Sequence, residues 1–111
     1  MKGIYIAGPI WGVKNYRERF EAAERAAKNY GWAVLNPAKL PGHLPRERYM
    51  PTCLMMVNAA DAVLLLDGWE MSAGAQIEKL FAEYQGKRIY KQQYFVADVP
   101  HIILKNEGEE E

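Results

Sequence analysis

The chain has 111 residues, of which 50% are apolar, and its 14 basic and 14 acidic side chains give a formal net charge of zero. This balance argues against nucleic acid and anionic membranes as partners. The single cysteine, Cys53, excludes an internal disulfide and a cysteine-rich metal site. No apolar run is long enough to span a bilayer and no leader precedes the first predicted strand, so we expect a cytoplasmic protein. The length suits one domain, placed at residues 1–105, followed by a disordered acidic tail at 106–111.

Hydrophobic periodicity and Gly/Pro breaks divide the chain into alternating strands and helices. In chain order they predict a strand at Lys2–Ala7, a helix at Asn15–Tyr30, a strand at Trp32–Leu35, a helix at Arg46–Ala60, a strand at Asp61–Leu66, a helix at Ser72–Tyr84, a strand beginning at Arg88–Tyr90 and a fifth strand at His101–Leu104. Such alternation indicates a parallel sheet with right-handed crossovers. We therefore expect an α/β fold, a flavodoxin-like or Rossmann-like three-layer sandwich whose parallel sheet has four or five strands in the order 2-1-3-4-5.

The three helices carry more specific predictions. Asn15 and Glu18 fit a capping box at the start of the first helix. Pro51 falls inside the second helix, which therefore either begins near this proline or kinks there. Ser72 is the expected N-cap of the third helix. The apolar stripe of this third helix is expected to form part of the core, and it consists of Ala73, Ile77, Leu80, Phe81 and Tyr84.

Two loops mark the expected ligand site. In parallel sheets of this order, ligands bind beyond the carboxyl ends of the strands, at the switch point between strands one and three. The loops Gly8–Lys14 and Asp67–Ser72 follow these two strands, so we expect them to face each other. Each carries one tryptophan, Trp11 or Trp69, and a planar ring at the mouth of a crevice suits a nucleobase or a sugar. The alternative is that each ring only closes its loop against the core.

Glu78, on the third helix, is the candidate catalytic residue. Its helical row contains the small residues Gly74, Ala75 and Ala82, and helical side chains lean towards the N-terminus, so Glu78 points back over them towards the crevice. A helical glycine costs about 1 kcal/mol relative to alanine, which indicates the close approach of another group to Gly74. A buried Tyr5 needs a hydrogen-bond partner, and Glu78 is in position to be one. The alternatives are a solvent-facing glutamate and a tyrosine that only packs the core.

The remaining polar motifs are less specific. Ser72 combines a hydroxyl with the free N–H groups of a helix N-terminus, which together suit a phosphate, although capping alone explains it equally well. The first loop has neither the spacing of a dinucleotide fingerprint nor that of a Walker A motif. Cys53 has no histidine partner, and His43 and His101 lack metal-ligand spacing. We interpret these three as non-catalytic and expect neither a metal nor a cofactor.

Four segments resemble the nucleoside 2-deoxyribosyltransferase superfamily. They are IYIAGP at Ile4–Pro9, VLNPA at Val34–Ala38, Asp61 at the start of a buried strand, and GWEMSAGAQIE at Gly68–Glu78, which is the most specific. Within the superfamily the chain looks most like a small phage and bacterial branch, the DUF4406-like proteins, and is similar to deoxynucleoside 5′-monophosphate N-hydrolases. The resemblance extends over roughly Met1–Tyr90.

The resemblance implies a role for each matched residue. Glu78 matches the nucleophile, which attacks the anomeric carbon of a deoxynucleoside, expels the base and forms a glycosyl-enzyme intermediate that water or a second base resolves. Tyr5 matches the residue that holds this carboxylate. The implied substrate-binding residues are Gly8, Pro9, Ile10, Trp11, Asn36, Gly68, Trp69, Ser72 and Gly74.

Differences from the family pattern refine the expected substrate. Transferases of the family have an acid at the position of Ser72, whereas the hydrolase branch has a serine that tolerates a 5′-phosphate. Cys53 stands where the family often has an aspartate that helps to protonate the departing base. Lys14 lies in the loop where the hydrolase branch has an arginine. Family members are dimers or larger, with the active site completed by a neighbour's C-terminal residues, and the resemblance suggests this role for residues 94–101, which no other pattern explains.

The expected function is therefore cleavage of the N-glycosidic bond, or deoxyribosyl transfer, on nucleosides or nucleoside 5′-monophosphates. The expected partners are such a nucleoside or nucleotide and further copies of the chain, as a homodimer or a higher homo-oligomer. One alternative is a non-catalytic nucleotide-binding module with a decayed active site, for which Cys53 is the main support. The other is a structural domain with an empty crevice.

Overall fold

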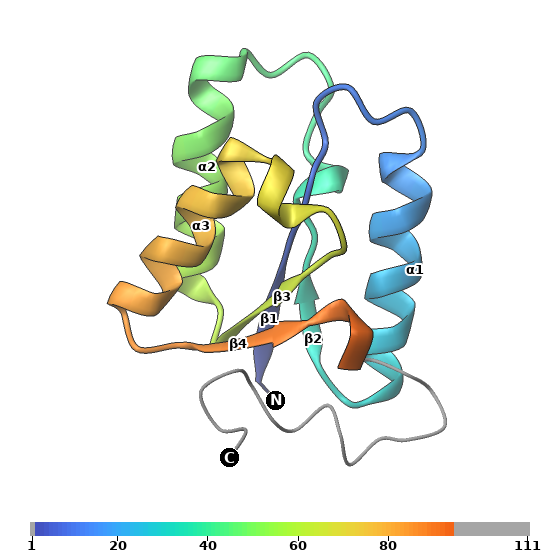
Figure 1. The fold of residues 1–111 in the computed structure, drawn as a ribbon, viewed down its shortest axis with the longest axis vertical. Helices are drawn as coiled ribbons and strands as arrows, with labels where there is room; N and C mark the ends of the chain where they lie inside the picture. The colour runs from blue at the N-terminus through green and yellow to red at the C-terminus, as the bar shows by residue number, and fades with distance from the viewer. Residues whose placement is uncertain (1, 95–111) are drawn as a thin grey trace.

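The computed structural model describes residues 2–94 (Figure 1). The predicted fifth strand at 101–104, the acidic tail at 106–111 and the part of the 94–101 segment beyond Tyr94 lie outside the described residues. The strands are β1 (Gly3–Ala7), β2 (Ala33–Leu35), β3 (Ala62–Leu65) and β4 (Arg88–Lys91), the α-helices are α1 (Tyr16–Asn29), α2 (Arg46–Ala59) and α3 (Ala73–Tyr84), and the short 3-10 helices are η1 (Pro37–Lys39), η2 (Trp69–Met71) and η3 (Gln92–Tyr94).

The four strands form one parallel sheet in the order β2-β1-β3-β4. Tyr5 in β1 lies in register with Leu35 of β2 and Val63 of β3. All four residues of β3 are buried, as expected for a central strand covered on both faces. The predicted α/β class and the order of the first four strands are confirmed.

Helices cover both faces of the sheet, which makes three layers. Figure 1 shows α1 on one side of the strands and α2 and α3 on the other. Because side chains alternate along a strand, Ile4 and Ile6 pack on the α1 side, whereas Tyr5 and Ala7 pack on the α2 and α3 side. This alternation aims the Tyr5 ring at the layer that carries Glu78.

The C-terminal end of α2 is anchored to the segment that follows α3. The Lys87 ammonium donates hydrogen bonds to the carbonyls of Val57 and Asn58 at 2.7 Å and of Ala60 at 2.6 Å. A cation at this end of a helix satisfies carbonyls that have no intrahelical partner and complements the helix dipole. The contact therefore fixes α2 relative to the end of α3, and both helices contribute to the candidate site.

One prediction about helix ends is wrong, and one of two alternatives for Pro51 is excluded. Asn15 precedes α1, but its φ of −102° and ψ of 31° lie outside the extended region and its side chain makes no capping hydrogen bond, so no capping box forms. The helix α2 begins at Arg46 and continues through Pro51, so it does not begin near the proline. Pro51 lies on the exposed face of α2, where water can reach the carbonyl that loses its N–H partner.

The predicted core stripe of α3 is wrong for most of its members, since only Phe81 packs against the core and Ala73 is exposed. Ile77, Leu80 and Tyr84 are 46%, 65% and 89% exposed, and the residues of α3 that are buried are Ala75, Glu78 and Ala82. The side of α3 that packs on the sheet is thus built from small residues and one glutamate. Since the helix is apolar on two opposite faces, periodicity alone selected the wrong one. Among residues 2–94, no helix combines the length and the apolar character needed to cross a membrane.

Candidate active site

A buried tyrosine–glutamate pair lies between the sheet and α3. The Tyr5 hydroxyl donates a hydrogen bond of 2.9 Å to Oε2 of Glu78. Tyr5 is fully buried and Glu78 is only 6% exposed. β1 aims the tyrosine and the small residues of α3 let the helix approach the strand closely, so two residues 73 positions apart in the sequence meet. The predicted partnership of Tyr5 and Glu78 is confirmed, and the solvent-facing alternative for Glu78 is wrong.

Cys53 of α2 joins this pair. It is fully buried and packs in the same apolar cluster as Tyr5 and Ala75, and its thiol lies near enough to Glu78 to lower the pKa of that carboxyl group. Burial raises the pKa of Cys53 to about 12, so the thiol stays protonated and acts as a neutral donor at physiological pH. The sequence predicts a non-catalytic cysteine because no histidine accompanies it, while the resemblance places Cys53 where the family often has an aspartate that helps to protonate the departing base.

The electrostatics of the cluster favour a protonated carboxyl group. Burial raises the pKa of Glu78 to about 7, although the hydrogen bonds from Tyr5 and Cys53 oppose this rise. Burial also raises the pKa of Tyr5 well above its usual value, so its hydroxyl remains a neutral donor. Near neutral pH, Glu78 therefore exists as a mixture of acid and carboxylate, a state typical of functional carboxyl groups.

The N-terminus of α3 begins as predicted, and its first turn contacts α2 at Gly74. Ser72 caps the helix, since its Oγ accepts a hydrogen bond of 3.1 Å from the N–H of Ala75. A Cβ atom added to Gly74 would lie only 2.9 Å from Cε of Met50 and 4.0 Å from Oγ of Ser72. The group that approaches Gly74 closely is thus a methionine from α2, and the open floor expected beside Glu78 is occupied by its methyl group.

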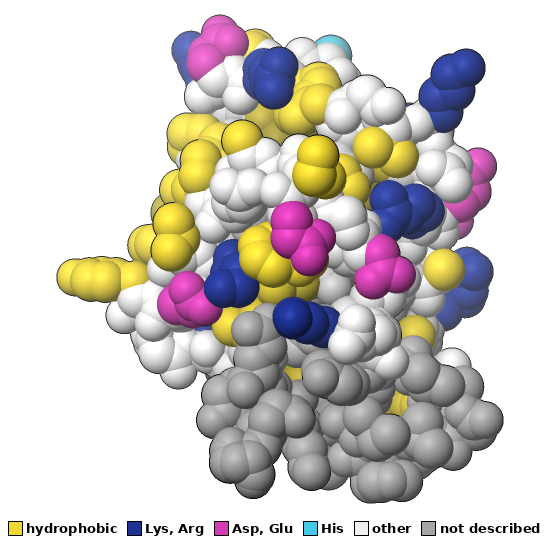
Figure 2. Space-filling model, in the orientation of Figure 1, with side chains coloured by type: hydrophobic (Ala, Val, Ile, Leu, Met, Phe, Trp, Pro, Cys, Tyr) yellow, Lys and Arg dark blue, Asp and Glu magenta, His cyan; other side chains and the backbone are white. Residues whose placement is uncertain are grey.

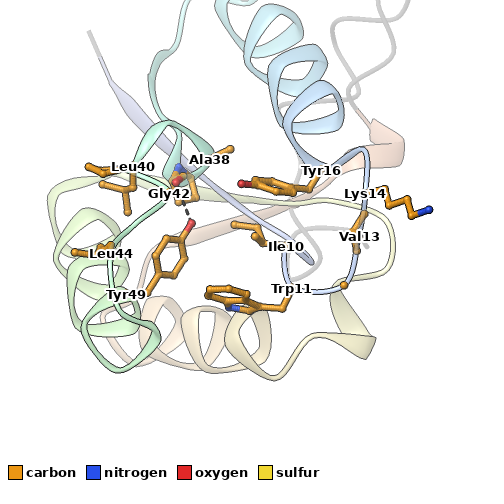
Figure 3. A pocket seen from close by; sticks show the side chains of 13 residues that line it. Ile10, Trp11, Val13, Lys14, Tyr16, Ala38, Leu40, Gly42, Leu44 and Tyr49 are labelled. Atoms are coloured by element: carbon orange, nitrogen blue, oxygen red, sulfur yellow. Dashed lines mark hydrogen bonds between the residues drawn. The ribbon is translucent and has the colours of Figure 1, made fainter.

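A cavity of about 430 Å³ opens next to this helix pair (Figure 3). Trp11 and Tyr49 meet edge to face with ring centroids 5.8 Å apart, and the guanidinium of Arg46 lies 4.9 Å from the Trp11 centroid. The Tyr49 hydroxyl donates to the carbonyl of Pro37 at 2.9 Å, which fixes the ring at the cavity wall. The cavity is lined by Ile10, Trp11, Gly12, Val13, Lys14, Tyr16, Pro37, Ala38, Leu40, Pro41, Gly42, Leu44 and Tyr49.

This cavity combines residues that the sequence predicted with others that it missed. Ile10 and Trp11 were expected at a ligand site, and they are indeed at the cavity. Tyr16 and Tyr49 were not expected there, because the former reads as a core position of α1 and the latter as an ordinary residue of α2. Three aromatic rings around a space of this size suit a planar heterocycle.

The two loops predicted to face each other do meet. A Cβ atom added to Gly8 would lie 2.9 Å from Cβ of Leu66, and one added to Gly68 would lie 3.5 Å from Cγ of Pro9. Gly68 also has a φ of +90°, which favours glycine. These glycines therefore allow the ends of β1 and β3 to come together, which is a structural reason for their presence.

The remaining predicted residues lie apart from the cavity. The Trp69 ring is covered by Lys79, whose Nζ is 5.4 Å from the ring centroid, and it lines a separate cavity of about 260 Å³. Asn36 is buried, donates to Glu24 at 2.9 Å and accepts from the N–H of Ala38 at 2.9 Å, so its side chain holds η1 in place. Within residues 2–94, no three His, Cys, Asp or Glu side chains come together as a metal site.

Comparison with known proteins identifies a family for the chain and a solved structure with a similar fold. A family model described as "Domain of unknown function (DUF4406)" matches residues 2–91. The chain belongs to the DUF4406 family. Among solved structures, this DUF4406 chain is similar to a 2-desoxiribosyltransferase from Leishmania mexicana, with a TM-score of 0.66 and 22% identity over 82% of the present chain. It spans 63% of the length of that protein. At this level of identity the similarity establishes a shared fold, and no curated protein matches the DUF4406 chain.

Proposed function

We propose that the protein cleaves the N-glycosidic bond of nucleosides or nucleoside 5′-monophosphates, or transfers their deoxyribosyl group, with Glu78 as the nucleophile. The observation that carries this proposal is the buried pair of Tyr5 and Glu78 beside a cavity walled by aromatic rings. The deoxyribosyltransferase fold supports it independently, because the solved relative is named for this chemistry.

The chemistry follows from the geometry of the pair. Tyr5 engages Oε2 of Glu78, which leaves Oε1 available to attack the anomeric carbon of the sugar. The new carbon–oxygen bond forms as the carbon–nitrogen bond breaks, and the electron pair of the carbon–nitrogen bond leaves with the base. Water or a second base then attacks the same carbon and releases the carboxylate. Because the pKa of Glu78 is about 7, the nucleophilic form increases as pH rises through neutrality.

The surroundings suggest where each part of a nucleotide binds. The base fits the cavity between Trp11, Tyr16 and Tyr49, whose rings offer stacking and apolar contact. A 5′-phosphate fits the N-terminus of α3 at Ser72, where backbone N–H groups and the helix dipole favour an anion. Lys14, at the rim of the cavity, adds a second positive charge. We therefore favour a nucleoside 5′-monophosphate as the substrate.

The outer face of α3 supports self-association, which we propose as a homodimer or a higher homo-oligomer. Figure 2 shows hydrophobic side chains gathered along the α2 and α3 flank of the molecule. Ile77, Leu80 and Tyr84 form a continuous exposed stripe, and such a patch is typical of an interface. Leu80→Lys should reduce the sedimentation-derived mass from an oligomer to a monomer, whereas an unchanged mass would place the interface elsewhere.

The decisive test is an assay for released base. Purified protein is incubated with a panel of deoxynucleosides, ribonucleosides and their 5′-monophosphates, and free base is measured by liquid chromatography. We expect release with wild-type protein and none with Glu78→Ala. Equal behaviour of the two proteins would refute the nucleophile. Thermal stabilisation by a nucleotide without any turnover would instead identify a nucleotide-binding module with a decayed site, in which Cys53 replaces a needed acid.

A further inference from the structure

Met50 of α2 packs on the side of α3 that carries Gly74 and Glu78. Met50 and Cys53 are three residues apart on α2 and share one face of that helix, and Gly74 and Glu78 are four apart on α3 and share one row. The Met50 methyl group lies against Gly74, and the Cys53 thiol lies near Glu78. Two sulfur-containing side chains of α2 therefore pack on one side of α3, with Met50 over Gly74 and Cys53 near Glu78.

The two sulfur groups differ in their freedom to move. Cys53 is fully buried, whereas Met50 is partly exposed and has solvent on one side. Methionine is unbranched and has three rotatable bonds, so it can leave its contact without strain in the backbone. Gly74 fits this contact because any side chain there would meet the methyl group at 2.9 Å. The glycine accommodates the methionine directly.

The covered row lies between the cavity and the carboxylate. Tyr49 lines the aromatic cavity, but Glu78 is absent from the cavity lining. Tyr49 and Met50 are consecutive residues of α2, so the residue that lines the cavity adjoins the residue that covers Gly74. A sugar attached to a base in the cavity must bring its anomeric carbon to about 3–3.5 Å from Glu78 before attack. We infer that its path crosses the space over Gly74, because Gly74 lies one helical turn before Glu78 on the same row of α3.

We propose that Met50 is a displaceable plug over Gly74, which closes the route to Glu78 in the free protein and is pushed aside by the sugar of the substrate. The substrate part of this inference rests on the proposed function, whereas the plug itself is a property of the free protein. Met50 is thus a positioning and selectivity residue, because the size of the sugar that can replace its side chain decides which substrates reach the carboxylate.

The first experiment needs no ligand. Full-length protein labelled at Glu carboxyl carbons is titrated by NMR, with the Glu78 resonance assigned by Glu78→Gln. Since the plug keeps water from Glu78, Met50→Ala should lower the apparent pKa of Glu78 by at least about half a unit, and Met50→Leu, which refills the space, should restore it. Met55→Ala, on the exposed face of the same helix, is the matched control and should change nothing. An unchanged Glu78 titration in Met50→Ala would overturn the plug.

The second experiment follows the plug directly. The chain has five methionines, so methyl-labelled protein gives few resonances, which Met→Leu variants assign. Gly74→Ala should shift the Met50 methyl resonance in the free protein and leave Met55 unmoved. Titration with deoxynucleoside 5′-monophosphates should shift Met50 with the affinity found by calorimetry. Binding with no shift of Met50 would refute its displacement. Absence of binding, together with a Met50-dependent Glu78 titration, would instead refute only the proposed function.

Discussion

Two buried glutamates on opposite faces of one sheet have pKa values shifted in opposite directions. Glu24 of α1 is 7% exposed and Glu78 of α3 is 6% exposed. Burial raises the pKa of both groups, but for Glu24 the hydrogen bonds from its neighbours outweigh burial and lower the pKa to about 2. For Glu78 burial prevails, and the pKa rises to about 7. Equal exposure thus accompanies pKa values about five units apart.

The difference in pKa has two causes: Glu78 lies deeper in the protein, and the partners of the two carboxyl groups differ in charge. Glu24 receives the ammonium groups of Lys28 at 2.8 Å and Lys39 at 3.0 Å, together with the Asn36 amide. The neighbours of Glu78 that affect its pKa through hydrogen bonding, in contrast, are a phenol and a thiol, both neutral. A carboxylate neutralised by two lysines is a poor nucleophile, and Glu24 instead holds α1 to the segment around η1. Among residues 2–94, the anionic form of Glu78 has neutral donors and no positive charge to stabilise it, so it is more reactive, which suits a nucleophile.

The largest expected effect is on catalysis. Glu78→Gln keeps an oxygen that can accept the Tyr5 hydrogen bond but removes the nucleophile, so base release should fall at least about 1,000-fold. Glu24→Gln, the matched change on the other face, should retain activity within about threefold. Liquid chromatography of the released base measures both. Equal losses of base release in the two variants would show that Glu78 has no catalytic role that Glu24 lacks.

The second effect is on stability and concerns Glu78 alone. The folded state holds a proton up to about pH 7, whereas the unfolded chain releases it near 4.5, so this group lowers the free energy of unfolding as pH rises between these values. The full cost above pH 7 is about 3 kcal/mol. Glu78→Gln should therefore be more stable than wild type at pH 8 by about 2–3 kcal/mol and nearly equal to it at pH 4.5, as measured by urea denaturation. A difference that does not vary with pH would contradict the raised pKa.

The third effect has the opposite sign. Because the folded-state pKa of Glu24 is about 2, its ionised form stabilises the protein above pH 4.5, and this contribution is lost as pH falls towards 2. Its lysine partners are largely exposed, so we expect about 1–2 kcal/mol. Glu24→Gln should be destabilised by this amount at pH 7, with a smaller difference at pH 3. Urea denaturation at the two pH values and at low and high salt tests it, since screening should also reduce the difference.

Sequence reasoning succeeded where one local pattern decides the outcome. The alternation of Ile4, Tyr5 and Ile6 fixes which side chain faces α3, and this led to the Tyr5–Glu78 contact. The fully apolar strand predicted its central place in the sheet, and Ser72 predicted the start of α3. In each case the responsible residues are neighbours in the chain or obey a period set by the backbone.

It failed where packing between distant elements decides. Both faces of α3 are apolar, and only the docking of the helix on the sheet selects the face with Ala75 and Ala82 for the interior. The contact of Met50 with Gly74 joins residues 24 positions apart on two different helices, and no local sequence pattern predicts it. The role of Tyr49 in the cavity depends likewise on where a loop folds back. Such contacts belong to the tertiary structure and have no periodic signature.

The smallest effect compares the starts of the two helices that carry these glutamates. Ser72 caps α3 through its hydroxyl, whereas Asn15 precedes α1 without a side-chain hydrogen bond. Ser72→Ala should therefore cost about 1 kcal/mol in urea denaturation, and Asn15→Ala close to nothing. Ser72→Asp separates capping from ligand binding, because aspartate also caps a helix but repels a phosphate. We expect it to keep the stability of wild type and to raise KM for a nucleoside 5′-monophosphate while leaving KM for the nucleoside nearly unchanged. A uniform effect on both substrates would place the phosphate away from the start of α3, and the hydroxyl of Ser72 would then serve the helix alone.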